Sequence, residues 1–286
     1  MVRNFHTAKF GQGGKIVRSY GAELLNIEQL KEQIPSIFAE EKHHSRSEKY
    51  SFIPTSDLLH RMAEEGFLPS EVRQGGSKDE EKRGFTKHLI RFRQQGGFVP
   101  VVNGDAFPEI ILVNAHDGTS SYQLMSGWFR LVCSNGMIIA DTCGLSIKVP
   151  HRGNVDDVIE ASYKVVGDFP EQIKKVEAMG QIELTAPEQI AYAEAAASLR
   201  FDEEAHVSPE SLLVVQRQSD VGNDLWRTFN RVQERLIRGG VRTRRRDANN
   251  RPIRGRSREV NNIGENVKLN QALWALTEKM MELKAN

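Results

Sequence analysis

The chain has 286 residues, 39% hydrophobic and 27% charged, which is enough for a sizeable core with helical extensions. It contains no run of about 18 apolar residues and starts without an apolar signal-peptide region, so we expect a cytoplasmic protein without a membrane span. Only two cysteines occur, which argues against a disulfide scaffold.

Charge is distributed unevenly along the chain, although the net charge is only +1. Residues 227–258 contain twelve arginines, no lysine and two acids, so this stretch carries 12 − 2 = +10 and the remainder carries +1 − 10 = −9. Such a concentration of positive charge is typical of a segment that binds an anionic partner, above all nucleic acid. A solvated, disordered arginine-rich loop is the alternative that composition leaves open.

The first predicted elements are a loosely ordered, glycine-containing segment over residues 1–20 and a helical stretch over 27–41 that is interrupted at Pro35. A short helix follows, which Thr55 or Ser56 can cap and which Gly66 stops.

Two strands are predicted next, over residues 67–73 and 85–93. In the second strand, Lys87, Arg91 and Arg93 alternate with apolar residues and therefore share one face. A basic sheet face of this kind can track a phosphate backbone, and a charged outer face is the commoner alternative.

The longest apolar runs lie between residues 110 and 140. The pair Asp117–Gly118 joins predicted strands over 110–115 and 121–125, and this is the strongest hairpin signal in the chain. Asn135–Gly136 predicts another turn.

The pattern becomes helical after Asn154, with helices predicted over 154–167 and 170–179 and a further helix beginning at Thr185. The clearest amphipathic helix covers residues 222–238, and glycines 239 and 240 end it. Its apolar stripe consists of Leu225, Phe229, Val232 and Leu236, and a second stripe presents Arg227, Arg231, Arg235 and Arg238.

These elements predict an α+β fold, with a central antiparallel β-sheet with hairpins covered by helices, and a helical C-terminal region. We place a partly helical N-terminal extension at 1–50, the α+β core domain at 51–167 and the helical region at 168–286, with an arginine-rich loop at 239–262.

Enzymatic chemistry has little support in the sequence. Cys133 with His116 as base and Asp117 to orient it would suit a cysteine hydrolase, yet Cys133 lies in an apolar run where cysteine usually packs. A zinc site built from His116, Cys133, Cys143 and His151 lacks ligand spacing. We therefore expect no catalytic residue, no metal and no cofactor, and keep a cryptic Cys/His enzyme as an alternative.

Arginine without lysine favours bidentate phosphate contacts. The candidates for nucleic-acid binding are Lys87, Arg91, Arg93, Arg227, Arg231, Arg235, Arg238, Arg242, Arg244, Arg245, Arg246, Arg251 and Arg254. Base stacking would fall to Phe85, Tyr122 or Trp128, although each is also a candidate core residue.

Several stretches carry a resemblance to a known family. They are Phe-Ile-Pro-Thr at 52–55, Thr-Lys-His at 86–88, and the segments 114–124, 129–136, 222–234 and 267–270. Through them most of the chain resembles the plasmid- and prophage-borne family called domain of unknown function 932. This resemblance implies a mobile-element origin and carries over no catalytic residues.

The predicted order of elements is also similar to the core of single-strand annealing proteins of the Rad-fifty-two and Red-beta type. Those proteins bind single-stranded DNA in a basic groove and form rings or filaments. The similarity implies single-stranded DNA as partner and a homo-oligomer.

Our leading hypothesis is a non-enzymatic mobile-element protein that binds single-stranded DNA and anneals complementary strands in recombination without ATP. The alternative is an interaction or anti-defence protein whose arginines dock on an acidic host protein.

Overall fold

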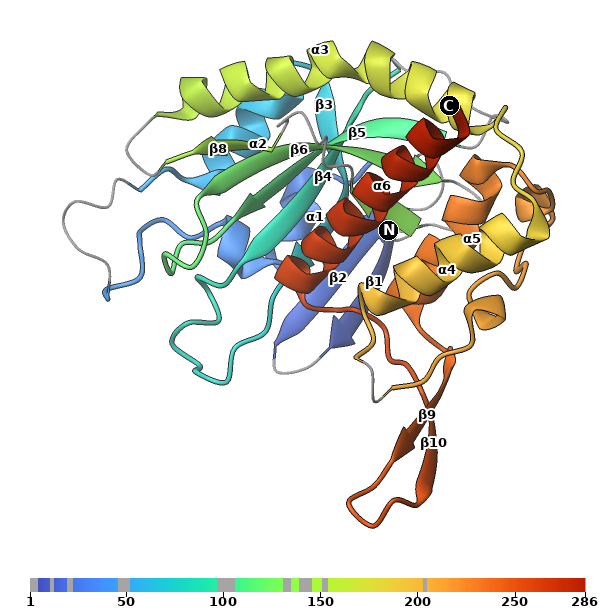
Figure 1. The fold of residues 1–286 in the computed structure, drawn as a ribbon. Coiled ribbons are helices and arrows are strands. Elements are labelled where there is room, and N and C mark those ends of the chain that lie inside the picture. The colour runs from blue at the N-terminus through green and yellow to red at the C-terminus, as the bar shows by residue number, and fades with distance from the viewer. Residues whose placement is uncertain are drawn as a thin grey trace. The chain divides into compact units, whose positions relative to one another are not determined.

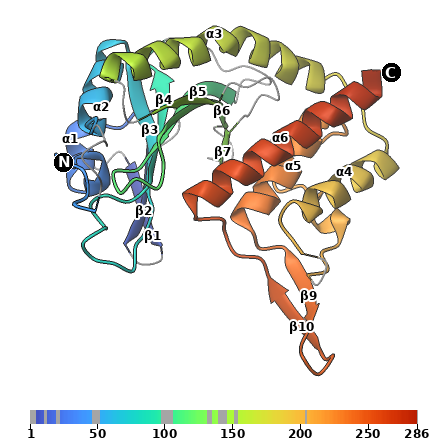
Figure 2. The same cartoon turned by 60° about the vertical axis from the view of Figure 1, so that its left-hand side comes forward.

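The computed structural model describes residues 5–10, 13–19, 23–45, 52–96, 106–130, 135–138, 146–150, 154–202 and 205–285. These residues form two compact units, one made of the described residues up to Phe169 and the other of those from Pro170 onward (Figures 1 and 2).

An antiparallel sheet of eight strands is the centre of the first unit. The sheet confirms the predicted α+β class with a central antiparallel sheet. Its strands lie in the order β1 (Phe5–Phe10), β2 (Gly14–Ser19), β3 (Phe67–Gln74), β4 (His88–Gln94), β5 (Ala106–Asn114), β6 (Tyr122–Arg130) and β7 (Asn135–Ile138), and β8 (Ile147–Val149) pairs with β6.

Two local predictions for the sheet are wrong. Residues 5–10 and 14–19 of the N-terminal segment are not loosely ordered, because β1 and β2 pair with each other and β2 pairs with β3, which gives their backbones hydrogen-bond partners. Asn135 and Gly136 do not form a turn, because they pair with Arg130 and Phe129 as the first residues of β7.

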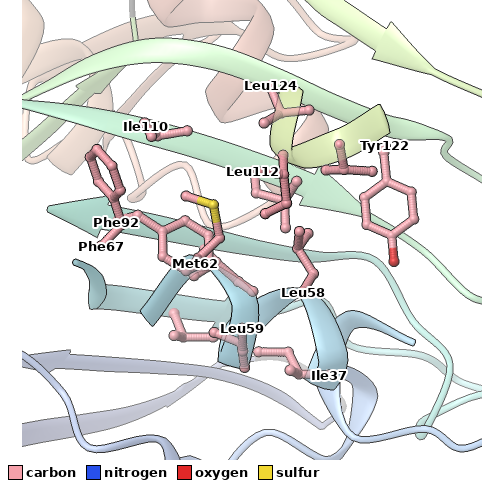
Figure 3. Close-up of a cluster of buried hydrophobic side chains, with 14 of the residues drawn as sticks. Ile37, Leu58, Leu59, Met62, Phe67, Phe92, Ile110, Leu112, Tyr122 and Leu124 are labelled. Atoms are coloured by element: carbon pink, nitrogen blue, oxygen red, sulfur yellow. The ribbon is translucent and has the colours of Figure 1, made fainter. Parts of the chain in front are cut away.

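Helices cover one face of this sheet and enclose the core of the first unit. They are α1 (Ile27–Lys31), the short 3-10 helix η1 (Pro35–Ile37), α2 (Thr55–Glu64) and the first part of α3 (Val155–Met179). Leu58, Leu59 and Met62 of α2 point into this core as the helical spacing predicts (Figure 3). Gly66 follows α2 with a φ of 81°, as predicted for the left-handed stop.

Helix α3 differs from the prediction of two separate helices. It runs unbroken through Gly167 and Pro170. Proline removes only one backbone donor from a helix, so the remaining turns can keep their hydrogen bonds on either side.

The second unit is mainly helical. Besides the end of α3, it contains α4 (Ala186–Ser198), the 3-10 helices η2 (Pro209–Ser211) and η3 (Gln218–Asp220), α5 (Leu225–Arg238), strands β9 (Arg242–Arg246) and β10 (Pro252–Arg256), and α6 (Ile263–Ala285). Thr185 and Glu188 form a capping box at the start of α4.

The core of the second unit includes the predicted apolar stripe of α5, whose four residues are all buried. The ring of Phe229 stacks on that of Trp226 with centroids 5.7 Å apart and meets Trp274 of α6 edge-on at 5.6 Å. None of the helices in the described part of the chain is long and apolar enough to cross a membrane.

Candidate nucleic-acid interface

The arginine-rich segment predicted as a loop forms an antiparallel hairpin of β9 and β10 (Figures 1 and 2). Asp247 organises its turn, because the backbone N–H of Asp247 donates to the Arg251 carbonyl at 3.0 Å and its carboxylate accepts from the Arg251 N–H at 2.8 Å. Asn250 takes a φ of 61°, a left-handed conformation that asparagine tolerates. Sequence reasoning missed this hairpin because its two strands lack the alternation of apolar and polar residues by which a strand is predicted.

The hairpin is fixed at its root by two glycines with a φ of 76° each, Gly239 and Gly240. The N–H of Gly240 donates to the Ser257 carbonyl at 2.8 Å, and the N–H of Ser257 donates to the Val241 carbonyl at 2.8 Å. Further along, Arg244 exchanges two backbone hydrogen bonds of 2.9 and 3.0 Å with His206, which attaches β9 to the rest of the second unit.

The two root glycines provide a matched pair for testing how the hairpin is held. A Cβ at Gly239 would lie 2.6 Å from the carbonyl oxygens of Ser257 and Arg258, whereas a Cβ at Gly240 would have nothing within 4 Å. We expect Gly240→Ala to cost about 1–2 kcal/mol of unfolding free energy from the left-handed φ alone. Gly239→Ala should cost roughly 1–3 kcal/mol more through overpacking. Urea denaturation of both variants measures the difference, and equal losses would contradict this account of the root.

The hairpin concentrates exposed positive charge. Residues 242–258 contain eight arginines and one acid, Asp247, so the segment carries 8 − 1 = +7, and all eight arginines are exposed. Six of them were predicted from the sequence as nucleic-acid-binding residues, namely Arg242, Arg244, Arg245, Arg246, Arg251 and Arg254, and the structure adds Arg256 and Arg258.

The register of the hairpin sorts these arginines onto two faces. Arg242 lies opposite Arg256, and Arg244 lies opposite Arg254. Because directly opposite residues share a face, and residues two apart along a strand do too, one side of the hairpin is a cationic face. Its arginines are Arg242, Arg244, Arg246, Arg254 and Arg256. Like charges directly opposite each other destabilise a hairpin, so this face gains stability when an anion binds.

The sequence predicted that the arginine stripe of α5 presents four available guanidinium groups. The structure does not show this. Each of these arginines contacts a polar group within the second unit, and Arg231 is buried. The contacts are Arg227 with Asp224 (2.6 Å), Arg231 with Gln189 (3.0 Å), Arg235 with the Ser211 carbonyl (3.1 Å) and Arg238 with Glu234 (3.6 Å).

The sheet arginines do not form an open phosphate track either. Arg91 and Arg93 share the predicted face of β4, but both are buried and both contact the carboxylate of Glu109 on β5, at 2.6 and 2.8 Å. Ser70 also donates to Glu109, at 2.7 Å. The positive charges of Arg91 and Arg93 are therefore neutralised in part by the buried carboxylate of Glu109 on the neighbouring strand.

A second buried acid, Glu71, extends this network on the sheet. It accepts from Arg73 at 2.5 Å and also from Arg18 of β2. Burial alone would raise the pKa of Glu71, but the guanidinium groups of Arg18, Arg73 and Arg91 outweigh it and hold the pKa well below its usual range.

The remaining candidates in the first unit are divided by burial. Tyr122 and Trp128 are fully buried, so in this structure neither ring can stack on a base. Phe85 and Lys87 are half-buried just before β4. Cys133, which was considered as a nucleophile, and Cys143 and His151, which were considered with it as zinc ligands, lie outside the described residues.

Comparison with known proteins gives the family. The family described as Domain of unknown function (DUF932) matches residues 42–274. The chain belongs to this family. Two relatives in Escherichia coli (strain K12), UPF0380 protein YfjQ and UPF0380 protein YafZ, are each 42% identical to it over 276 residues, covering 96% of this chain and 97% of their own. No solved structure matches significantly.

Three stretches that carry the family resemblance, 52–55, 86–88 and 114–124, meet at one buried hydroxyl, Thr55 Oγ1. His88 Nδ1 lies 3.3 Å from the Thr86 carbonyl, which can only accept, so Nδ1 carries the proton and Nε2 accepts from Thr55 at 3.1 Å. Thr55 Oγ1 then accepts from Asn114 Nδ2 at 3.2 Å and from His116 Nε2 at 3.0 Å.

The hydroxyl of Tyr122 lies 3.1 Å from Thr55 Oγ1 but donates its proton to the Ile53 carbonyl at 2.7 Å, so it packs beside Thr55 without donating to it. The prediction that Thr55 or Ser56 caps α2 is wrong, because the N-cap is Pro54 and no side chain caps the helix; the hydroxyl of Thr55 instead contacts side chains of β4, β5 and β6. One donor and two acceptor positions of this hydroxyl are thereby occupied, as its chemistry allows. The cluster therefore connects α2 to the sheet through buried polar contacts.

Proposed function

We propose that the protein binds DNA through the β9–β10 hairpin, and that it holds single strands and promotes their annealing without ATP. The observation that carries the proposal is the cationic face, five exposed arginines on one side of a hairpin with two arginine pairs directly opposite each other. A polyanion relieves the repulsion that this face creates within the protein.

The spacing of the arginines suits a phosphate backbone. Residues on one face of a strand recur about every 6.7 Å, and guanidinium groups form bidentate contacts with phosphate oxygens. Annealing requires two strands to be held together, so the proposal includes a homo-oligomer. The same proposal includes that the protein originates from a mobile element and takes part in recombination.

The proposal predicts how binding of a labelled single-stranded oligonucleotide varies with salt. Replacing Arg242, Arg244, Arg254 and Arg256 by alanine should reduce the slope of log affinity against log salt by about 3, since each lost phosphate contact removes about 0.7. Annealing of complementary strands, followed by fluorescence energy transfer, should slow in the same variant. Fluorescence anisotropy from low to high salt measures the slope.

Two controls make this test specific. Replacing four exposed lysines of the first unit, Lys9, Lys31, Lys78 and Lys164, by alanine removes the same charge and should leave most of the slope intact. Arginine-to-lysine changes at the four hairpin positions should retain the slope and lower the affinity. Absence of binding at low salt, or an unchanged slope in the alanine variant, would refute the proposal.

The alternative of an interaction protein uses the same arginines against an acidic protein surface. It would be favoured if the hairpin were required for capture of an acidic host protein while DNA failed to bind at any salt concentration.

A further inference from the structure

The second face of the hairpin differs chemically from the cationic face. By register it holds Arg245 opposite Ile253 and Thr243 opposite Gly255. Ile253 is 52% exposed, a large aliphatic side chain in an otherwise polar ribbon. Gly255 adds no side chain, so the backbone itself forms part of this surface.

This second face forms one wall of an open groove of about 390 Å³. The other wall is formed by Arg200 and Phe201, which follow the C-terminal end of α4. From the hairpin the groove is lined by Thr243, Arg245, Ile253, Gly255, Arg256 and Ser257.

The wall opposite the hairpin is an ordered aromatic surface. Phe201 is half-buried, and the guanidinium carbon of Arg200 lies 5.3 Å from the centre of its ring. Arg200 also donates to the backbone carbonyls of Leu236 and Arg258, which ties this wall to the root of the hairpin. An aromatic ring and an exposed isoleucine therefore face a groove that is bordered by cations.

The groove can be reached from a free strand edge. In the described part of the chain β10 pairs only with β9, whereas β9 is bridged on its other side by His206. A nucleic-acid strand that follows the β10 edge would place phosphates near Arg254 and Arg256 and could turn a base past Gly255.

We propose that this groove binds a nucleobase of single-stranded nucleic acid, stacked against Phe201 and Ile253, while the arginines of β10 hold the flanking phosphates. The inference rests on the proposed function and adds a preference to it. Stacking is independent of base identity and requires an unpaired base, so the site selects single strands over duplex without reading sequence.

The test compares two probes of equal length and charge, a single-stranded oligonucleotide and its abasic counterpart. Loss of stacking of one base reduces affinity by about 5-fold to 150-fold, and we expect the wild-type protein to prefer the base-bearing strand by such a factor. Phe201→Ala and Ile253→Ser should bring the ratio toward one, with the salt slope unchanged because the phosphate contacts remain.

Val221→Ser is a matched control, because Val221 is 53% exposed in the same unit and lies outside the groove. Phe201→Trp should retain the preference, which separates stacking from a general loss of folding in Phe201→Ala. Equal affinity of the wild-type protein for both probes, with a normal salt slope, would overturn the nucleobase site and leave the proposed function standing. Failure to bind either probe would overturn both.

Discussion

Replacing Glu109 with glutamine is expected to lower the free energy of unfolding by about 3–5 kcal/mol. The side chain of Glu109 is fully buried and contacts Arg91 and Arg93, whose side chains are 1% and 4% exposed. The amide keeps the shape of the carboxylate but removes its charge. Two buried cations would then share a neutral partner, and each would carry an uncompensated desolvation cost.

Urea denaturation measures this loss, and the chain offers a matched comparison. Glu80 contacts Arg83 at 2.9 Å with both side chains exposed, so Glu80→Gln should cost under about 1 kcal/mol. Combining Glu109→Gln with Arg91→Met should recover part of the loss, because one buried cation is removed together with its partner. Similar losses for the two glutamine variants would show that the sheet network is not buried as described.

Stability should also fall as the pH drops from about 6.5 to 4, because of His88. Burial lowers the pKa of His88 from 6.5 to about 4, and the Thr86 carbonyl and the charge of Asp117 offset this only in part. The unfolded chain therefore binds a proton in this range that the folded chain excludes. The free energy of unfolding is unaffected by His88 protonation above pH 6.5. It falls by about 3 kcal/mol as the pH is lowered to 4.

The geometry around His88 agrees with this direction. A proton on His88 Nε2 would point at the hydroxyl of Thr55, which already donates to that nitrogen, and His116 and Tyr122 face the same hydroxyl. Denaturation at several pH values should show a shallower slope for His88→Gln. The exposed His60 on α2 supplies the control, since His60→Gln should keep the wild-type slope. A wild-type slope in His88→Gln would contradict the assignment.

Local sequence pattern was sufficient for much of the fold. Alternation placed Ile90 and Phe92 on the core face and Arg91 and Arg93 on the other, and the 3.6-residue period placed Leu225 and Phe229 inside the second unit. These predictions succeed because side-chain direction within one element depends on backbone geometry alone.

Partners across the fold could not be read in the same way. The acid that neutralises Arg91 lies on another strand, 18 residues further along the sequence. Thr55 contacts His116, which is 61 residues away in the sequence. The local sequence pattern cannot predict such pairs, because they arise from strand order and register. The candidate interface changed for the same reason. The arginines of β4 are buried against Glu109 and those of α5 contact polar groups of their own unit, whereas the eight hairpin arginines are exposed even where one of them, Arg245, lies 3.4 Å from Asp202.

The sequence by itself determined the α+β class, the amphipathic faces and a polarised cationic segment, because composition and periodicity are properties of neighbouring residues. Only the tertiary structure decided which cations face solvent. Strand pairing brought Glu71 and Glu109 to the sheet arginines, and the register of β9 against β10 set five arginines on one face and a groove beside the other. The availability of a charge depends on its spatial neighbours, and folding sets those.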